Sequence, residues 1–198
     1  MKADPVNVHS ATEEETTPCL FKQALGADYF ALPEPVRDLH EVSSSRTFRG
    51  TADVTRGNSG LGNLVCALVG FPPEANDVPV TVAIERRGDK EHWQRTFGKK
   101  TFASVLSLRG ANGGGHICER FGALEFDIDL EFENARLHYP VKRARGFGVP
   151  LPRWLVPVSQ ASEFEENGRF NFDVKVSLPG IGMLVRYRGV LTPDDKEV

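Results

Sequence analysis

Cysteines, long apolar runs and metal-binding spacings are all scarce in this sequence of 198 residues. The three cysteines, Cys19, Cys66 and Cys118, are odd in number, far apart and in no Cys-x-x-Cys arrangement, which argues against a disulfide framework or a zinc ribbon. We expect all three to be small buried residues. The N-terminal residues have neither the apolar stretch of a signal peptide nor the composition of a transit peptide, so the expected location is the cytoplasm.

The absence of several motifs excludes other classes of function. No apolar run approaches the roughly 18 residues of a membrane-spanning helix. The five histidines stand at no ligand spacing, and neither a Walker A motif nor a dinucleotide fingerprint occurs, so the sequence predicts no metal site and no cofactor. A formal net charge of −3 argues against a dedicated nucleic-acid binder, which would normally be strongly basic.

The negative charge is concentrated at the two ends of the chain. Residues 1–18 and 194–198 are acidic and without hydrophobic periodicity, and we expect both to be disordered tails. The body between them, residues 19–193, has slightly more basic than acidic residues. It is expected to form a single β-rich domain.

Alternation of apolar and polar residues dominates this body. In residues 124–134, LEFDIDLEFEN, the side chains of Phe126, Ile128 and Leu130 share one face and the carboxylates share the other. Asn167–Gly168 is a strong hairpin signal. Nine or ten such strands follow one another with almost no intervening helix, which excludes a doubly wound parallel sheet. Because many strands in one domain must hide their edges, we predict an antiparallel barrel or a strongly curved sheet.

Helices are expected at two places. Apolar spacing between Pro18 and Val42 predicts two short helices with a turn near Gly26–Pro33, packed on the larger body. Residues 61–71, LGNLVCALVGF, are apolar nearly all round and predict one buried or lid-like helix.

A long composite pattern is similar to a known bacterial family. It comprises GVPLPRWLVP (148–157), ENGRFNFDVKVSLPGIG (166–182) and LVRYRGVL (184–191), with RTFRGTADVTRG (46–57) among the upstream segments. Across residues 19–193 the chain resembles the family called domain of unknown function 4166. That family has no established activity, and its members occur alone or behind Rossmann-type domains similar to saccharopine dehydrogenases and sugar-nucleotide epimerases. The resemblance therefore implies a dehydrogenase-like, NAD(P)-binding protein as a potential partner.

Arginines interleaved with aromatic residues suggest a ligand site. On the inner face of a curved sheet, such arginines would offer cationic groups within an apolar cavity. Alternatively, they lie outside and pair with Asp127, Glu131 or Asp173 across strands. The candidate ligand-binding residues are Trp93, Arg95, Phe102, Arg120, Phe172, Arg186, Tyr187 and Arg188.

The segment 146–157, GFGVPLPRWLVP, is apolar and rich in proline, and it includes Trp154 next to Arg153. Packing across one end of the sheet is the leading interpretation. A loop over the mouth of a cavity, a partner-binding patch and a contact with a membrane surface are the alternatives.

Three functions follow from these observations. The leading one is non-catalytic binding of an amphipathic or anionic small molecule, such as a fatty acyl or isoprenoid-like compound, in the interior. The second is an accessory module for a dehydrogenase-like partner. The third is a cyclase- or isomerase-like enzyme with Glu163 or His138 as the acid–base group.

Overall fold

The computed structural model describes residues 18–194. The predicted tails, 1–18 and 194–198, lie outside the described residues except for Pro18 and Asp194, so nothing tests their disorder. The chain is mainly β, as predicted. The helices are α1 (Leu20–Leu25), the 3-10 helix η1 (Gly26–Ala31), α2 (Glu34–His40), α3 (Gly60–Val69) and the 3-10 helix η2 (Arg153–Leu155).

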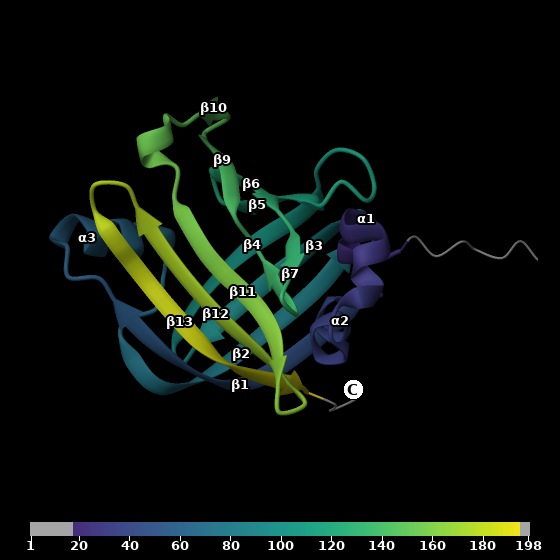
Figure 1. Cartoon of the computed structure of the whole chain (residues 1–198). Coiled ribbons are helices and arrows are strands. Elements are labelled where there is room, and N and C mark those ends of the chain that lie inside the picture. Colours follow the sequence, from purple (N-terminus) through teal and green to yellow (C-terminus); the bar gives the residue numbers. More distant parts are fainter. Residues whose placement is uncertain (1–17, 195–198) are drawn as a thin grey trace, which may run out of the picture.

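The strands form one antiparallel sheet that curves strongly around an interior (Figure 1). In chain order they are β1 (Ser45–Arg56), β2 (Ala75–Arg87), β3 (Lys90–Phe97), β4 (Lys100–Leu108), β5 (His116–Phe121), β6 (Leu124–Asp129), β7 (Glu131–Glu133), β8 (Arg136–His138), β9 (Val141–Gly146), β10 (Val149–Pro150), β11 (Val158–Glu166), β12 (Arg169–Leu178) and β13 (Gly182–Pro193). Their order across the sheet is β10-β9-β6-β5-β4-β3-β2-β1-β13-β12-β11-β8-β7.

One interrupted hairpin contributes strands near both edges of this sheet, β6 with β9 next to β10 and β7 with β8 at the other edge. β6 continues into β7 through Leu130, and β8 continues into β9 through Tyr139 and Pro140. The Tyr139 N–H donates to the carbonyl of Ala161 at 3.2 Å, while the carbonyl of Pro140 accepts from Asp129 N–H at 3.1 Å. The ladder breaks here because a proline has no N–H to donate. The hydrogen-bonded sheet is therefore not closed. The chain nevertheless passes between its two edges, from β6 to β7 and from β8 back to β9.

Strand alternation places the core on the concave face, as the 124–134 pattern predicts. Ile128 and Leu130 are buried, and Phe126 packs against the core. On the convex face, Asp127 pairs with Arg109 and Arg145. The arginines of these pairs are 43% and 29% exposed, so solvent screens both pairs. Burial of the apolar concave face is therefore the main source of stability.

Two glycines allow β1 and β13 to approach closely where the sheet bends. A Cβ at Gly50 would lie 1.8 Å from the carbonyl oxygen of Val190, and one at Gly189 would lie 2.1 Å from that of Thr51. Any side chain at these positions would push the two strands apart.

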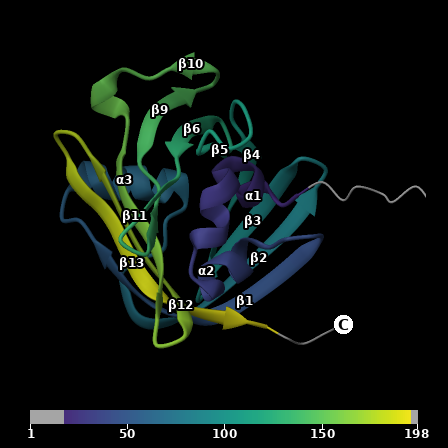
Figure 2. The ribbon, with the colours of Figure 1, turned by 45° about the vertical axis from the view of Figure 1, so that its right-hand side comes forward.

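Helices cover opposite ends of the curved sheet (Figure 2). α1 and α2 bury Phe21, Val36 and Leu39 at the end where β11 turns into β12, which confirms the two predicted short helices. α3 follows the other end of β1 and confirms the predicted apolar helix. Ser59 caps it by accepting from the Gly62 N–H at 3.3 Å. None of the helices in the described part of the chain is long and apolar enough to span a membrane.

Candidate functional site

A cavity of about 370 Å³ lies inside the curve of the sheet. α1 and α2 contribute Phe21 and Leu39 at one end, and α3 contributes Val65 and Val69 at the other. The walls between them are largely apolar and include Val82, Phe97, Leu106, Ile117, Phe172 and Leu191. A volume of this size is within the range of small-molecule sites.

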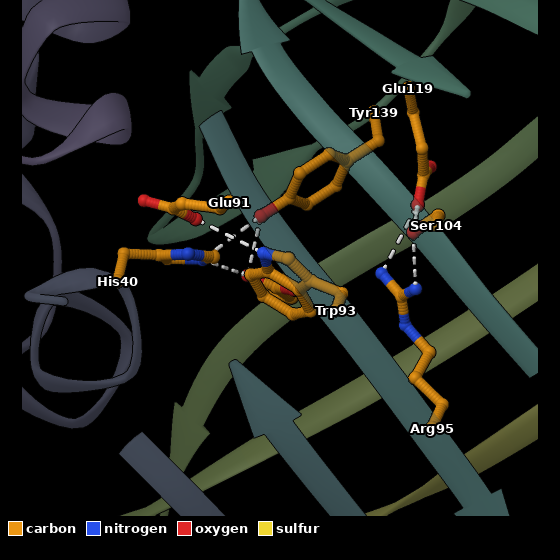
Figure 3. Close-up of polar contacts among 8 residues, drawn as sticks. His40, Glu91, Trp93, Arg95, Ser104, Glu119 and Tyr139 are labelled. Atoms are coloured by element: carbon orange, nitrogen blue, oxygen red, sulfur yellow. Dashed lines mark hydrogen bonds and ion pairs between the residues drawn. The ribbon is translucent and has the colours of Figure 1, made fainter. Parts of the chain in front are cut away.

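Arg95 is the centre of a polar cluster in the cavity wall (Figure 3). Its guanidinium donates to Ser104 Oγ at 2.8 Å and to Glu119 Oε1 at 3.2 Å, and the Ser104 hydroxyl donates to the same carboxylate oxygen at 2.7 Å. The three residues come from the neighbouring strands β3, β4 and β5. The guanidinium also lies 4.8 Å from the ring centroid of Trp93, which holds it against the wall.

A second cluster lies where the sheet ladder is interrupted. Tyr139 Oη donates to Glu163 Oε2 at 2.5 Å, and the same oxygen is 2.6 Å from His40 Nε2. Tyr139 and Glu163 line the cavity. Burial first, and the Glu163 carboxylate second, raise the pKa of Tyr139 well above its ordinary value. His40 is fully buried and stacks on Phe21 with 3.6 Å between ring centroids.

Glu91 lies behind this second cluster. Its Oε2 accepts from Trp93 Nε1 at 3.0 Å, and burial raises the pKa of its carboxyl. Among residues 18–194, Glu91 Oε1 and His40 Nδ1 are buried side-chain atoms without a hydrogen-bond partner. Leaving a buried polar group unpaired costs about 1–3 kcal/mol.

The charges around the cavity are unequal. Its lining includes one guanidinium, that of Arg95, and two carboxylates, those of Glu119 and Glu163. Arg95 is already paired with Glu119. The lining therefore disfavours an anionic group and can instead hydrogen-bond an uncharged hydroxyl, carbonyl or amide.

Five of the eight predicted ligand-binding residues line this cavity: Trp93, Arg95, Phe102, Phe172 and Tyr187. Ligand binding by them stays a prediction.

Within the described chain, Arg120, Arg186 and Arg188 lie off the cavity lining, which corrects the expectation that they share its inner face. On β13, Val185 and Tyr187 point inward, so alternation turns Arg186 outward, where it pairs with Asp173. The alternative of cross-strand pairing outside the sheet was the correct one for Arg186.

The sequence prediction did not single out Glu119, Ser104 or Tyr139. Glu119 shares one face of β5 with Ile117 and Phe121, and this spacing of two would have placed its side chain inside. Tyr139 gave no such signal because the strand is interrupted at Pro140.

Other predicted residues can also be placed. Glu163, predicted as an acid–base group, lines the cavity, whereas His138 lines a groove on the outer face. The three cysteines are free and buried, as expected.

Comparisons with known proteins identify the family of this chain, but the matching proteins have no assigned activity. The uncharacterised protein YndH of Bacillus subtilis (strain 168) is 24% identical over an alignment of 195 positions, and the match covers 86% of this chain and 95% of YndH. No solved structure matches the chain. The family model described as Domain of unknown function (DUF4166) matches residues 32–191. The chain therefore belongs to the DUF4166 family, whose function is not established.

Proposed function

We propose that the protein binds an amphipathic small molecule with an uncharged polar head in the cavity, without transforming it. The observation that supports this proposal most directly is an apolar cavity of about 370 Å³ whose wall contains a compact polar cluster. The apolar part of the molecule would lie against Phe97, Leu106 and Phe172. The three free, buried cysteines are consistent with a cytoplasmic protein.

Volume limits the size of the molecule. A cavity of about 370 Å³ lies near the lower end of the roughly 300–1,000 Å³ range of small-molecule sites. A cavity of this size suits a fatty alcohol or a short isoprenoid alcohol, whereas a diacyl lipid does not fit entirely inside.

Charge limits the head group. An acid would place its carboxylate near Glu119 and Glu163, while the single cation, Arg95, is already paired. An alcohol can donate to Glu119 or Glu163 and accept from Arg95 or Tyr139. We therefore propose that the polar head group of the ligand is uncharged, where the sequence suggests an acidic one.

Competition between two ligands of equal chain length tests this proposal. The neutral fluorescent probe N-phenyl-1-naphthylamine would be bound to the purified protein and displaced with dodecanol or with dodecanoate at neutral pH. We expect dodecanol to displace the probe at least about tenfold more effectively, a preference that corresponds to about 1.4 kcal/mol. Equal displacement, or stronger displacement by dodecanoate, would contradict the uncharged head. A failure of the probe and both competitors to bind would contradict the cavity proposal itself.

Acid–base chemistry is a second candidate because Tyr139 and Glu163 share a short hydrogen bond in the cavity wall. Such a pair can donate and accept protons if a substrate reaches hydrogen-bonding distance. An isomerised or cyclised product recovered after incubation with an isoprenoid alcohol would favour this candidate over plain binding. Docking on a dehydrogenase-like partner stays a prediction that no contact in the described residues tests.

A further inference from the structure

Exposed apolar side chains gather at one end of the molecule. Of the nine large hydrophobic residues that are exposed in the described chain, eight lie on α3 or between β9 and the start of β11. Leu68 is 78% exposed, Trp154 65% and Phe147 89%. The full set is Leu61, Leu64, Leu68, Phe147, Val149, Trp154, Leu155 and Val158. We call the surface formed by these eight residues the apolar rim.

The apolar rim lies at the α3 end of the cavity. α3 turns Val65 and Val69 into the cavity while Leu64 and Leu68 face solvent. The loop around η2 likewise contributes Leu151 and Pro157 to the cavity lining, while Trp154 within η2 is exposed. In Figure 1 the turn between β12 and β13 lies between α3 and η2. Each segment is therefore apolar on two sides, although only one side packs on the protein.

Charge distinguishes this end from the opposite one. The connections at the α3 end comprise residues 57–74, 97–102, 121–124, 146–162 and 178–185. Their charged residues are Glu74, Lys99, Lys100 and Arg153, all exposed, so cations outnumber acids by three to one. The opposite end mixes both signs, as in the turn Glu166–Asn167–Gly168–Arg169.

We propose that the apolar rim docks on the surface of an anionic lipid bilayer. Apolar groups, an interfacial tryptophan and an excess of cations over acids are the features that bind proteins to such surfaces. A protein partner with an acidic apolar groove would use the same features, but the rim is divided between a helix and a loop at one end of the cavity, which suits a deformable lipid surface better. Docking in this orientation would place the α3 end of the cavity at the lipid headgroups. The exposed residues support this inference whatever the cavity contains.

Co-sedimentation with vesicles tests the proposal on the full-length protein. One set of vesicles would be phosphatidylcholine alone and the other an equimolar mixture with phosphatidylglycerol. We expect binding to the mixed vesicles, weaker binding to the neutral ones, and loss of the difference at high salt.

Variants separate the two contributions to binding. Leu64→Ser/Leu68→Ser and Trp154→Ser should each weaken binding to mixed vesicles by about tenfold or more, because each removes apolar surface that enters the headgroup region. Lys99→Glu/Lys100→Glu should weaken it by at least about twenty-fold on mixed vesicles and have little effect on neutral ones. All these side chains are exposed, and circular dichroism would verify that the variants fold.

Matched controls come from the opposite end of the molecule. Phe30 is 63% exposed beside α1, so Phe30→Ser removes a comparable apolar group away from the rim. Arg169→Glu reverses a charge in the turn between β11 and β12. Neither control should change vesicle binding.

Several outcomes would overturn the proposal. These are no binding to mixed vesicles, equal losses from the controls and the rim variants, or a concentration-dependent dimer in solution that the rim variants dissociate. Displacement of the fluorescent probe by dodecanol does not require a bilayer, so failure on vesicles is distinguishable from failure of the cavity proposal.

Discussion

The pair formed by Arg95 and Glu119 gives the sharpest quantitative prediction. Their side chains are only 17% and 16% exposed, and Ser104 bonds to both. Removing one partner of a buried pair leaves an uncompensated charge and costs about 3–5 kcal/mol. Because some solvent reaches the pair, we expect Arg95→Met to cost about 3 kcal/mol, at the lower end of that range.

Replacement of the whole cluster should have a different effect. The triple variant Arg95→Met/Ser104→Ala/Glu119→Leu leaves no polar group of this cluster unpaired, so its free energy of unfolding should lie within about 1 kcal/mol of the wild type or above it. If so, the cluster is not needed for stability, whereas the proposed function needs it for the ligand head. The triple variant should then fold but discriminate poorly between dodecanol and a hydrocarbon.

Urea unfolding monitored by tryptophan fluorescence measures these effects, with equal m-values as the check on two-state behaviour. Arg186→Met is the matched control, because it breaks an ion pair with Asp173 whose side chains are 43% and 27% exposed. It should cost about 0–1 kcal/mol. The reasoning fails if Arg95→Met costs no more than this control, or if the triple variant is as unstable as the single one.

Three further predictions concern the buried groups and the bend of the sheet. Burial raises the pKa of Glu91, so the folded protein holds this proton more tightly than the unfolded chain, and stability falls as pH rises above about 4.3. Glu91→Gln should therefore raise the urea midpoint at pH 8, with a difference that narrows towards pH 4, and a pH-independent difference would contradict this. Burial raises the pKa of Tyr187 to about 12, so its phenol should ionise later than that of a free tyrosine in an ultraviolet titration, and stability should fall as pH rises from about 10 through this value. A wild-type titration that matches Tyr187→Phe near pH 10 to 12 would refute this assignment. Gly50→Ala should cost about 3 kcal/mol or more in urea unfolding, because its Cβ would lie 1.8 Å from the Val190 carbonyl, whereas Gly60→Ala, with nothing within 4 Å, should not destabilise.

Local pattern predicts local structure well in this chain. Alternation in residues 124–134 identifies the buried face of β6, and the apolar run near residues 61–71 identifies α3. If β6 with β7 and β8 with β9 are each counted once and the two-residue β10 is left out, the sheet has ten strands, at the upper end of the prediction.

The cavity wall was harder to predict because its polar groups come from distant parts of the sequence. His40 and Glu163 are 123 residues apart, and they meet only because α2 packs against β11. On β13 both alternating sets contain apolar residues, Leu184 with Arg186 and Val185 with Tyr187, so parity alone does not identify the inner face. A register shift between β12 and β13 at Leu184 breaks the alternation, so Leu184 lines the cavity beneath α3 as Tyr187 does farther along the strand.

The central claim is that the molecule occupies the interior of the sheet, and nuclear Overhauser contacts test it most directly. The protein would be labelled at its methyl groups and saturated with dodecanol. We predict contacts from the alkyl chain to the methyl groups of Val82, Leu106 and Ile117, which line the cavity. Contacts confined to the exposed methyl groups of Leu61, Leu64 and Leu68, or no contacts at all, would contradict it.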